Sequence, residues 1–135
     1  MLFLKKLTLQ NLISLRNLSL NSNQQLMSIS FENLIVLESK SIMYFAKLKV
    51  INFKNLNSPI SFNSTPDNRL EFVSFENTPS LTDVNLGRSS HLETVMFIDA
   101  PRMKPLDLSS CRLISFPVSI LTLTSLEILN NMQNN

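Results

Sequence analysis

The sequence predicts a β-rich solenoid, in which short parallel strands stack around one continuous core. Three observations predict it: apolar residues recur every 11 residues, alternate 11-residue arms form a unit that repeats every 22 residues, and apolar and polar residues alternate within each arm. The 11-residue anchors, with one 22-residue step across residue 59, are Leu4, Leu15, Leu26, Leu37, Leu48, Leu70, Leu81, Leu92 and Met103. We therefore expect residues 1–135 to form a single domain.

The alternation within each arm predicts the strands. Alternating residues of a strand point to opposite faces, so one face of each arm is expected to enter the core. A 22-residue coil has room for two such strands and two turns, but not for a helix of ordinary length. Successive coils should then build parallel sheets in which like residues form columns with a spacing of about 4.8 Å.

Two columns of the first arm are particularly regular. One column contains Phe31, Phe53, Phe75 and Phe97, and the other contains Asn11, Asn33, Asn55, Asn77 and Asp99. The phenylalanines predict a buried spine. The asparagines follow the strands in a chain with one Gly, so we expect Asn to supply the positive φ angles of the turns. Their amides are expected to pair with backbone groups of those turns.

Other segments resemble a known family. The patterns Leu15-x-x-Leu18-x-Leu20-x-x-Asn23 and Met103-x-x-Leu106-x-Leu108-x-x-Cys111 are similar to the leucine-rich repeat. The segment Phe116-Pro117-x-x-Ile120-x-x-Leu123-x-x-Leu126 resembles the second half of longer repeats in that family. The resemblance implies an α/β leucine-rich-repeat-type solenoid that is strongly β-rich, with stacked parallel strands and little helix except near the C-terminus.

The pattern is lost in one internal segment and at both ends. Residues 57–69 lack the anchors and contain Pro59 and Pro66, so we expect an irregular loop there. The apolar residues 2–4 provide no polar cap, and residues 126–129 start another repeat that dissolves into the asparagine-rich residues 130–135. These features indicate either a fragment of a longer array, which would contact further repeats or domains, or a degraded repeat tract.

The residue types disfavour catalysis and cofactor binding. The chain has one His, one Cys and one Gly, so we expect neither a catalytic site nor a metal or cofactor site. The net charge of +2 makes nucleic acid an unfavourable partner. Residues 1–57 carry seven Lys/Arg and two Asp/Glu (net +5), residues 58–135 carry five and eight (net −3), and we attribute this difference to solvated faces.

The sequence leaves localisation open. The chain contains no apolar run of the roughly 18 residues that would span a bilayer, so we expect no membrane insertion. Its first residues do not form a signal peptide. Either the protein is cytoplasmic, which we slightly favour, or a leader lies outside this sequence.

The expected function is that of a non-catalytic protein-binding module that presents a rigid strand face to a partner of unknown identity. The alternative is a structural spacer or surface repeat array without a specific ligand. The second-arm face is our candidate partner site, with Arg16, Asn17, Ser19, Thr82, Asp83, Asn85, Arg88, Lys104 and Asp107. The alternative first-arm face has apolar residues where solvent is expected, namely Val50, Phe72, Met96 and Ile98. This second set indicates either an interface or contact with a missing neighbour.

Overall fold

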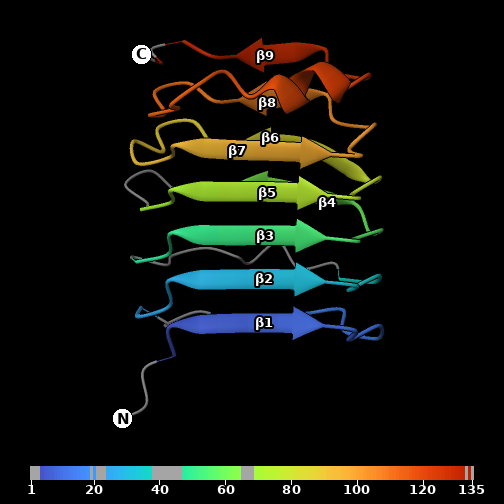
Figure 1. Ribbon diagram of the computed structural model, residues 1–135. Coiled ribbons are helices and arrows are strands. Elements are labelled where there is room, and N and C mark those ends of the chain that lie inside the picture. Colours follow the sequence, from blue (N-terminus) through green and yellow to red (C-terminus); the bar gives the residue numbers. More distant parts are fainter. Residues whose placement is uncertain are drawn as a thin grey trace.

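The computed structural model describes residues 4–18, 20, 24–37, 47–64, 69–132 and 134, and these form a parallel β-solenoid (Figure 1). The first sheet has the order β1 (Lys6–Gln10), β2 (Ser28–Glu32), β3 (Val50–Lys54), β5 (Phe72–Glu76) and β7 (Thr94–Ile98). The second has the order β4 (Ile60–Asn63), β6 (Leu81–Asn85), β8 (Pro105–Asp107) and β9 (Ile128–Asn130). The prediction of a β-rich solenoid with stacked parallel strands is therefore confirmed.

Helix is nearly absent from the described part of the chain. A 3₁₀ helix, η1 (Val118–Thr122), follows Pro117 and lies against β7 in the last coil. Ile120 of η1 and Leu123, which directly follows it, are buried, so this segment covers the core where a further strand of the first sheet would lie. The 22-residue unit explains the scarcity of helix, because two strands and two turns use nearly all of its residues.

The register of the first sheet follows the sequence repeat. Each residue pairs with the residue 22 positions later, as in Phe31 with Phe53 and Phe53 with Phe75. The second sheet is less regular, with a shift between Ile60 and Ser61 in β4. The sequence period thus fixes which side chains are neighbours across coils.

The predicted phenylalanine spine is confirmed. Phe31, Phe53, Phe75 and Phe97 are at most 1% exposed. Their successive ring centroids are 5.4, 5.0 and 5.3 Å apart, and the rings are stacked. This spacing is close to the distance between neighbouring strands, so each ring packs against the ring above and the ring below.

The expected irregular loop over residues 57–69 is wrong for its central part. Ile60–Asn63 form β4, which pairs in parallel with β6. Phe62 is buried, and its ring centroid lies 5.4 Å from that of Phe53 and 5.9 Å from that of Phe75. Pro59 precedes the strand and therefore removes no hydrogen bond from it. Residues 65–68 lie outside the described residues.

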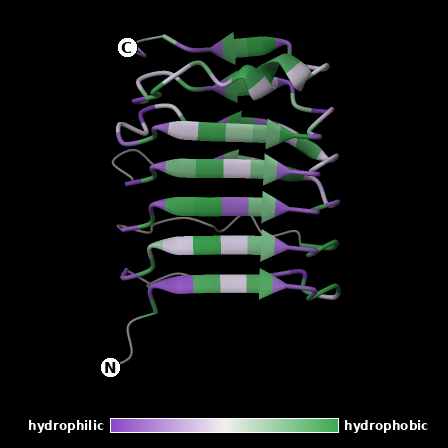
Figure 2. Cartoon of the chain, viewed as in Figure 1, coloured by the Kyte–Doolittle hydropathy of each residue, from purple (hydrophilic) through white to green (hydrophobic). Residues whose placement is uncertain are grey.

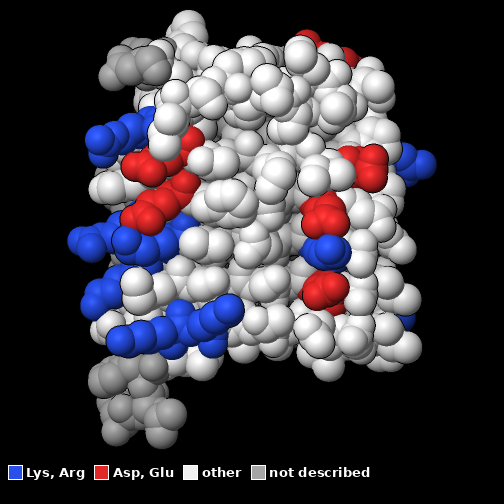
Figure 3. Space-filling model, in the orientation of Figure 1, with Lys and Arg blue, Asp and Glu red and all other residues white. Residues whose placement is uncertain are grey.

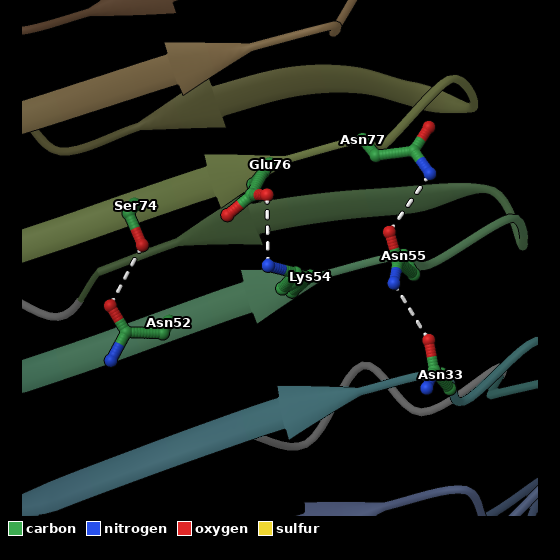
Figure 4. Close-up of polar contacts among 7 residues, drawn as sticks. All are labelled: Asn33, Asn52, Lys54, Asn55, Ser74, Glu76 and Asn77. Atoms are coloured by element: carbon green, nitrogen blue, oxygen red, sulfur yellow. Dashed lines mark hydrogen bonds and ion pairs between the residues drawn. The ribbon is translucent and has the colours of Figure 1, made fainter.

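The asparagine column makes the turns that follow the strands of the first sheet. Asn11, Asn33, Asn55 and Asn77 have φ angles between 49° and 59°, as expected for turns made without Gly. Their amides do not pair with turn backbone as expected but form a ladder (Figure 4). Nδ2 of Asn55 donates to Oδ1 of Asn33 at 2.7 Å, and Nδ2 of Asn77 donates to Oδ1 of Asn55 at 2.9 Å. The ladder therefore links the coils outside the core.

Replacing Asn55 with Ala should destabilise the fold by about 2–3 kcal/mol. The substitution removes two amide hydrogen bonds and puts a Cβ-bearing residue without a local polar group at a φ of 53°. Asn55→Gly is the matched control, because Gly adopts this φ freely and loses the ladder alone. Chemical denaturation should place Asn55→Gly between the original protein and Asn55→Ala. Equal stabilities of the two variants would show that the backbone angle imposes no cost.

Thr78 is an irregularity in the core. It occupies the column of Leu34 and Leu56, is 0% exposed, and its Oγ1 has no hydrogen-bond partner. A buried hydroxyl without a partner lowers stability, so Thr78→Val should raise the free energy of unfolding by about 1 kcal/mol. Thr78→Ser keeps the hydroxyl and loses a methyl group, so its melting temperature should fall. A lower melting temperature for Thr78→Val would contradict this account of the site.

Candidate partner-binding site

A pocket of about 320 Å³ lies on the second sheet. Its volume is at the lower end of the roughly 300–1,000 Å³ that is usual for ligand pockets. It extends over all four strands of that sheet, and the residues that line it are Asn63, Asp83, Val84, Asn85, Pro105, Leu106, Asp107, Ile128 and Asn130. The pocket is thus built from the same positions of successive coils.

The polar lining comes mainly from one column at the ends of the strands. Asn63, Asn85, Asp107 and Asn130 are paired in register across β4, β6, β8 and β9. Oδ1 of Asn85 accepts the backbone N–H of Gly87 at 3.0 Å, and Oδ1 of Asp107 accepts that of Ser109 at 2.8 Å. Such side-chain turns are typical of Asn and Asp. They fix one oxygen of each side chain at the edge of the pocket.

The Asp107 carboxylate lies in the space next to Gly87, where there is no side chain. A Cβ at position 87 would lie 3.1 Å from Cγ and from both carboxylate oxygens of Asp107. This is tighter than nine in ten such contacts, so the carboxylate would have to shift by a few tenths of an ångström to admit a residue with a Cβ. The sole glycine of the chain therefore serves the pocket and not a turn of positive φ.

The pocket has negative charge that its lining does not neutralise. Asp83 and Asp107 are both half-buried, and the lining contains no Lys or Arg. Oδ2 of Asp83 accepts a hydrogen bond from the Thr82 hydroxyl at 3.2 Å. Nζ of Lys104, just before β8, lies 2.8 Å from Oε1 of Glu127. That hydrogen bond and the charge of Glu127 raise the pKa of Lys104, so its ammonium group stays protonated beside Glu127.

The structure brings together three of the residues predicted for this face. Asp83, Asn85 and Asp107 line the pocket. Three more are exposed but do not line it, namely Thr82 within β6, Arg88 in the turn after β6, and Lys104 just before β8. Arg16 and Asn17 are exposed in the first coil, where residues 15–18 and Leu20 belong to no strand. Ser19 lies outside the described residues.

Sequence reasoning missed two polar residues of the pocket. Asn63 lay in the expected loop, and Asn130 lay where the repeat was expected to dissolve. Asn63 precedes Asn85 by 22 positions, and Asn85 precedes Asp107 by the same interval. This spacing is the signal that would have identified Asn63 as part of the column.

The alternative face lies on the first sheet, on strands β3, β5 and β7. Val50 and Phe72 are half-buried neighbours in register, whereas Met96 and Ile98 are 37% and 42% exposed on β7. Figure 2 shows a hydrophilic or neutral residue between hydrophobic ones in β2, β3 and β5, whereas β7 is hydrophobic along most of its length. Figure 3 shows charged side chains in two stripes on either side of a largely uncharged centre.

The polar side chains of this first face contact one another. Nζ of Lys54 lies 2.9 Å from Oε1 of Glu76, and the Ser74 hydroxyl donates to Oδ1 of Asn52 at 2.7 Å (Figure 4). Lys49 forms an ion pair with the Glu71 carboxylate. These contacts connect neighbouring coils, so the charged side chains that form them are paired within the solenoid.

Cys111 has no features of a nucleophile. It is buried, and its Sγ donates to the Leu86 carbonyl oxygen at 3.2 Å. Burial raises the pKa of its thiol to about 11, so the reactive thiolate is scarce at neutral pH. Across the ranges that the structure describes, no three His, Cys, Asp or Glu side chains are placed to hold a metal ion, and no helix has the length and apolarity to cross a membrane.

Comparison of the chain with protein-family models, with curated proteins and with solved structures finds no match.

Proposed function

We propose that this protein is a non-catalytic, leucine-rich-repeat-type module that binds a protein partner through the outer face of the second sheet. The observation that carries the proposal is the pocket in which Asp83 and Asp107 lie beside the amides of Asn63, Asn85 and Asn130. Concave sites with a few fixed polar groups beside apolar ones are common sites of recognition.

The difference between the two faces supports this assignment. On the first face the ion pairs Lys49–Glu71 and Lys54–Glu76 connect neighbouring coils. Within the described ranges, Asp83 and Asp107 have no such cationic partner. A carboxylate that the protein leaves unpaired is available to a partner's hydrogen-bond donors.

The leucine-rich-repeat assignment is supported by Cys111 and by the last coil. Cys111 occupies the position at which the resembled pattern has Asn or Cys. Its thiol donates a hydrogen bond to the carbonyl oxygen of Leu86. The Phe116–Leu126 segment, which resembles the second half of longer repeats, contains η1. Both observations agree with the family pattern at the residues that carry the resemblance.

A rigid strand face is suited to this function. The strands of both sheets are fixed by parallel pairing, and the phenylalanine spine lies beneath them. Few side chains need to be ordered on binding, which keeps the entropic cost of association low. We expect the energy of binding to be concentrated in a few residues of the pocket.

The test compares matched substitutions on the two faces. A partner is first identified with a photo-reactive side chain at Ser61, which is exposed in β4 and pairs in register with Asp83. Asp83→Ala should then weaken that partner by about fivefold or more, which corresponds to about 1 kcal/mol. Arg88→Ala tests the exposed turn beside the pocket. Phe72→Ala and Met96→Ala on the first face should leave the affinity unchanged.

Melting temperatures of the four variants provide the control for folding. Loss of affinity for the first-face variants alone would assign the site to the first sheet. Unchanged affinity for all four would show that the strand faces do not carry the binding.

A further inference from the structure

The charges that line the second-sheet pocket restrict what can occupy it. Asp83 and Asp107 are half-buried and are the only charged residues of the lining. Within the described ranges neither carboxylate has a cationic partner, whereas Lys49, Lys54 and Lys104 each pair with a glutamate. A half-buried carboxylate has lost part of its hydration, so a cation that enters the pocket is favoured over a neutral or acidic group.

Each of the two carboxylates keeps one oxygen free. Oδ1 of Asp107 accepts the backbone N–H of Ser109 at 2.8 Å, and Oδ2 of Asp83 accepts the Thr82 hydroxyl at 3.2 Å. The second oxygen of each carboxylate accepts no hydrogen bond from the described residues. The internal bonds therefore hold the two side chains in place, and the free oxygens are acceptors for the N–H groups of a cation.

The rest of the lining suits the apolar stem of a long side chain. Val84 of β6 and Pro105 and Leu106 of β8 line the pocket on the same two strands that carry the carboxylates. Lysine and arginine bury such a stem along apolar surface and place their charge at its tip. An inorganic cation would make no use of these apolar residues. The volume of about 320 Å³ is sufficient for one long side chain.

From these observations we propose that the pocket binds a basic side chain, lysine or arginine, of the protein partner. This rests on the proposed function, because it names the group of the partner that the second sheet recognises. The charged tip donates to the free oxygens of Asp83 and Asp107, and the stem lies against the apolar part of the lining. The amide oxygens of Asn63 and Asn130 are further acceptors at the edge of the pocket.

The test uses the 135-residue chain and a short probe peptide, acetyl-Gly-Arg-Gly-amide. A matched peptide contains citrulline, which has nearly the shape of arginine but no charge. In a titration followed by nuclear magnetic resonance, the arginine peptide should shift the side-chain amide signals of Asn63, Asn85 and Asn130. It should bind at least about fivefold more tightly than the citrulline peptide. Added salt should reduce this difference, because the charges are screened.

Two outcomes of the titration would overturn the proposal. One is equal affinity for the two peptides, because the charge of the side chain would then contribute nothing. The other is the absence of any shift of the three amide signals at arginine-peptide concentrations up to about 10 mM, since even a weak contact of millimolar affinity is detected there.

Substitutions of Asp by Asn locate the contact. Asp83→Asn and Asp107→Asn each remove a charge and keep the shape of the side chain. Asn85, in register with Asp107, makes the same kind of side-chain turn, so Asp107→Asn should keep its bond to the Ser109 N–H. Each variant should bind the arginine peptide about fivefold or more weakly and the citrulline peptide as before.

Asp99→Asn is the matched control. Asp99 is exposed in a turn of the first sheet, at a position of positive φ where other coils have Asn. The same chemical change there should leave the affinity for both peptides unchanged. The pocket is not the site if Asp83→Asn and Asp107→Asn keep the original affinity, or if Asp99→Asn lowers it by the same factor.

The captured partner separates this proposal from the proposed function. Asp83→Ala changes both the charge and the shape of the pocket, whereas Asp83→Asn changes the charge alone. A partner that is weakened by Asp83→Ala but not by Asp83→Asn or Asp107→Asn would support the second-sheet face and overturn the basic side chain. Charge-dependent binding of the arginine peptide, with a partner that Asp83→Ala leaves unaffected, would support the preference of the pocket and contradict the proposed function.

Discussion

Replacing Phe75 with Ala is expected to destabilise the protein by about 3–5 kcal/mol, which is a large part of the stability of a chain of this size. The Phe75 ring is 1% exposed and contacts three other rings. It stacks on Phe53 at 5.0 Å and on Phe97 at 5.3 Å, and it meets Phe62 edge-on. Truncation leaves a cavity that both sheets border, so neighbouring coils cannot close it by a small shift.

Phe72→Ala is the matched control for this experiment. Phe72 lies on the same strand, β5, but on its outer face, where it is only half-buried. The same truncation there should lower the melting temperature by much less. Thermal unfolding of the two variants measures the difference, and a Phe75→Ala protein that melts like Phe72→Ala would refute the buried spine.

The fold of the first sheet could be predicted from the sequence because one period determines which of its residues are buried and how its strands are aligned. Apolar residues at 22-residue intervals must enter the core together, and the strands that carry them are thereby placed in register. The Phe column and the turns made by Asn follow from the same rule. The amide ladder does not follow from this rule. The period shows that the asparagines are neighbours but not which of their atoms form hydrogen bonds.

The second sheet was predictable only in part. Pro59 and Pro66 suggested a loop, yet Ile60 and Phe62 kept the alternation of a strand. Burial of Phe62 against the phenylalanine spine outweighs the preference of this proline-containing segment for a loop. That preference is weak because a proline just before a strand costs little. An isolated segment of four residues does not carry that information, which comes from the coils on either side.

The pocket was predictable at the level of residue types but not of shape. Asp83, Asn85 and Asp107 were candidates because they occupy solvent positions of the second arm. Their convergence depends on side-chain turns to Gly87 and Ser109 and on the space that Gly87 leaves. These are properties of the folded backbone, and a pattern of apolar residues does not determine them.

Under the proposed function, the two sheets have different roles. In the first sheet, ion pairs, hydrogen bonds and the amide ladder join the coils outside the core. In the second, Asp83 and Asp107 remain available beside a pocket. Stability and recognition are therefore assigned to different surfaces, and substitutions on one should leave the property of the other largely intact.

The structural unit of the protein is the 22-residue coil and not the 11-residue arm. Removing residues 70–91 deletes one coil and lets β3 pair with β7 in the register that both share with β5. Removing residues 70–80 deletes one arm and moves every later arm to the wrong sheet. Nearest-neighbour stacking predicts that the first deletion lowers the melting temperature moderately and that the second abolishes the fold.

Thermal unfolding of the two deletion variants, followed by far-ultraviolet circular dichroism, is the measurement that tests this claim most directly. We expect a cooperative β-sheet transition for the protein without residues 70–91 and none for the protein without residues 70–80. The 22-residue coil would be contradicted if the protein without residues 70–80 unfolds cooperatively at a temperature equal to or above that of the protein without residues 70–91.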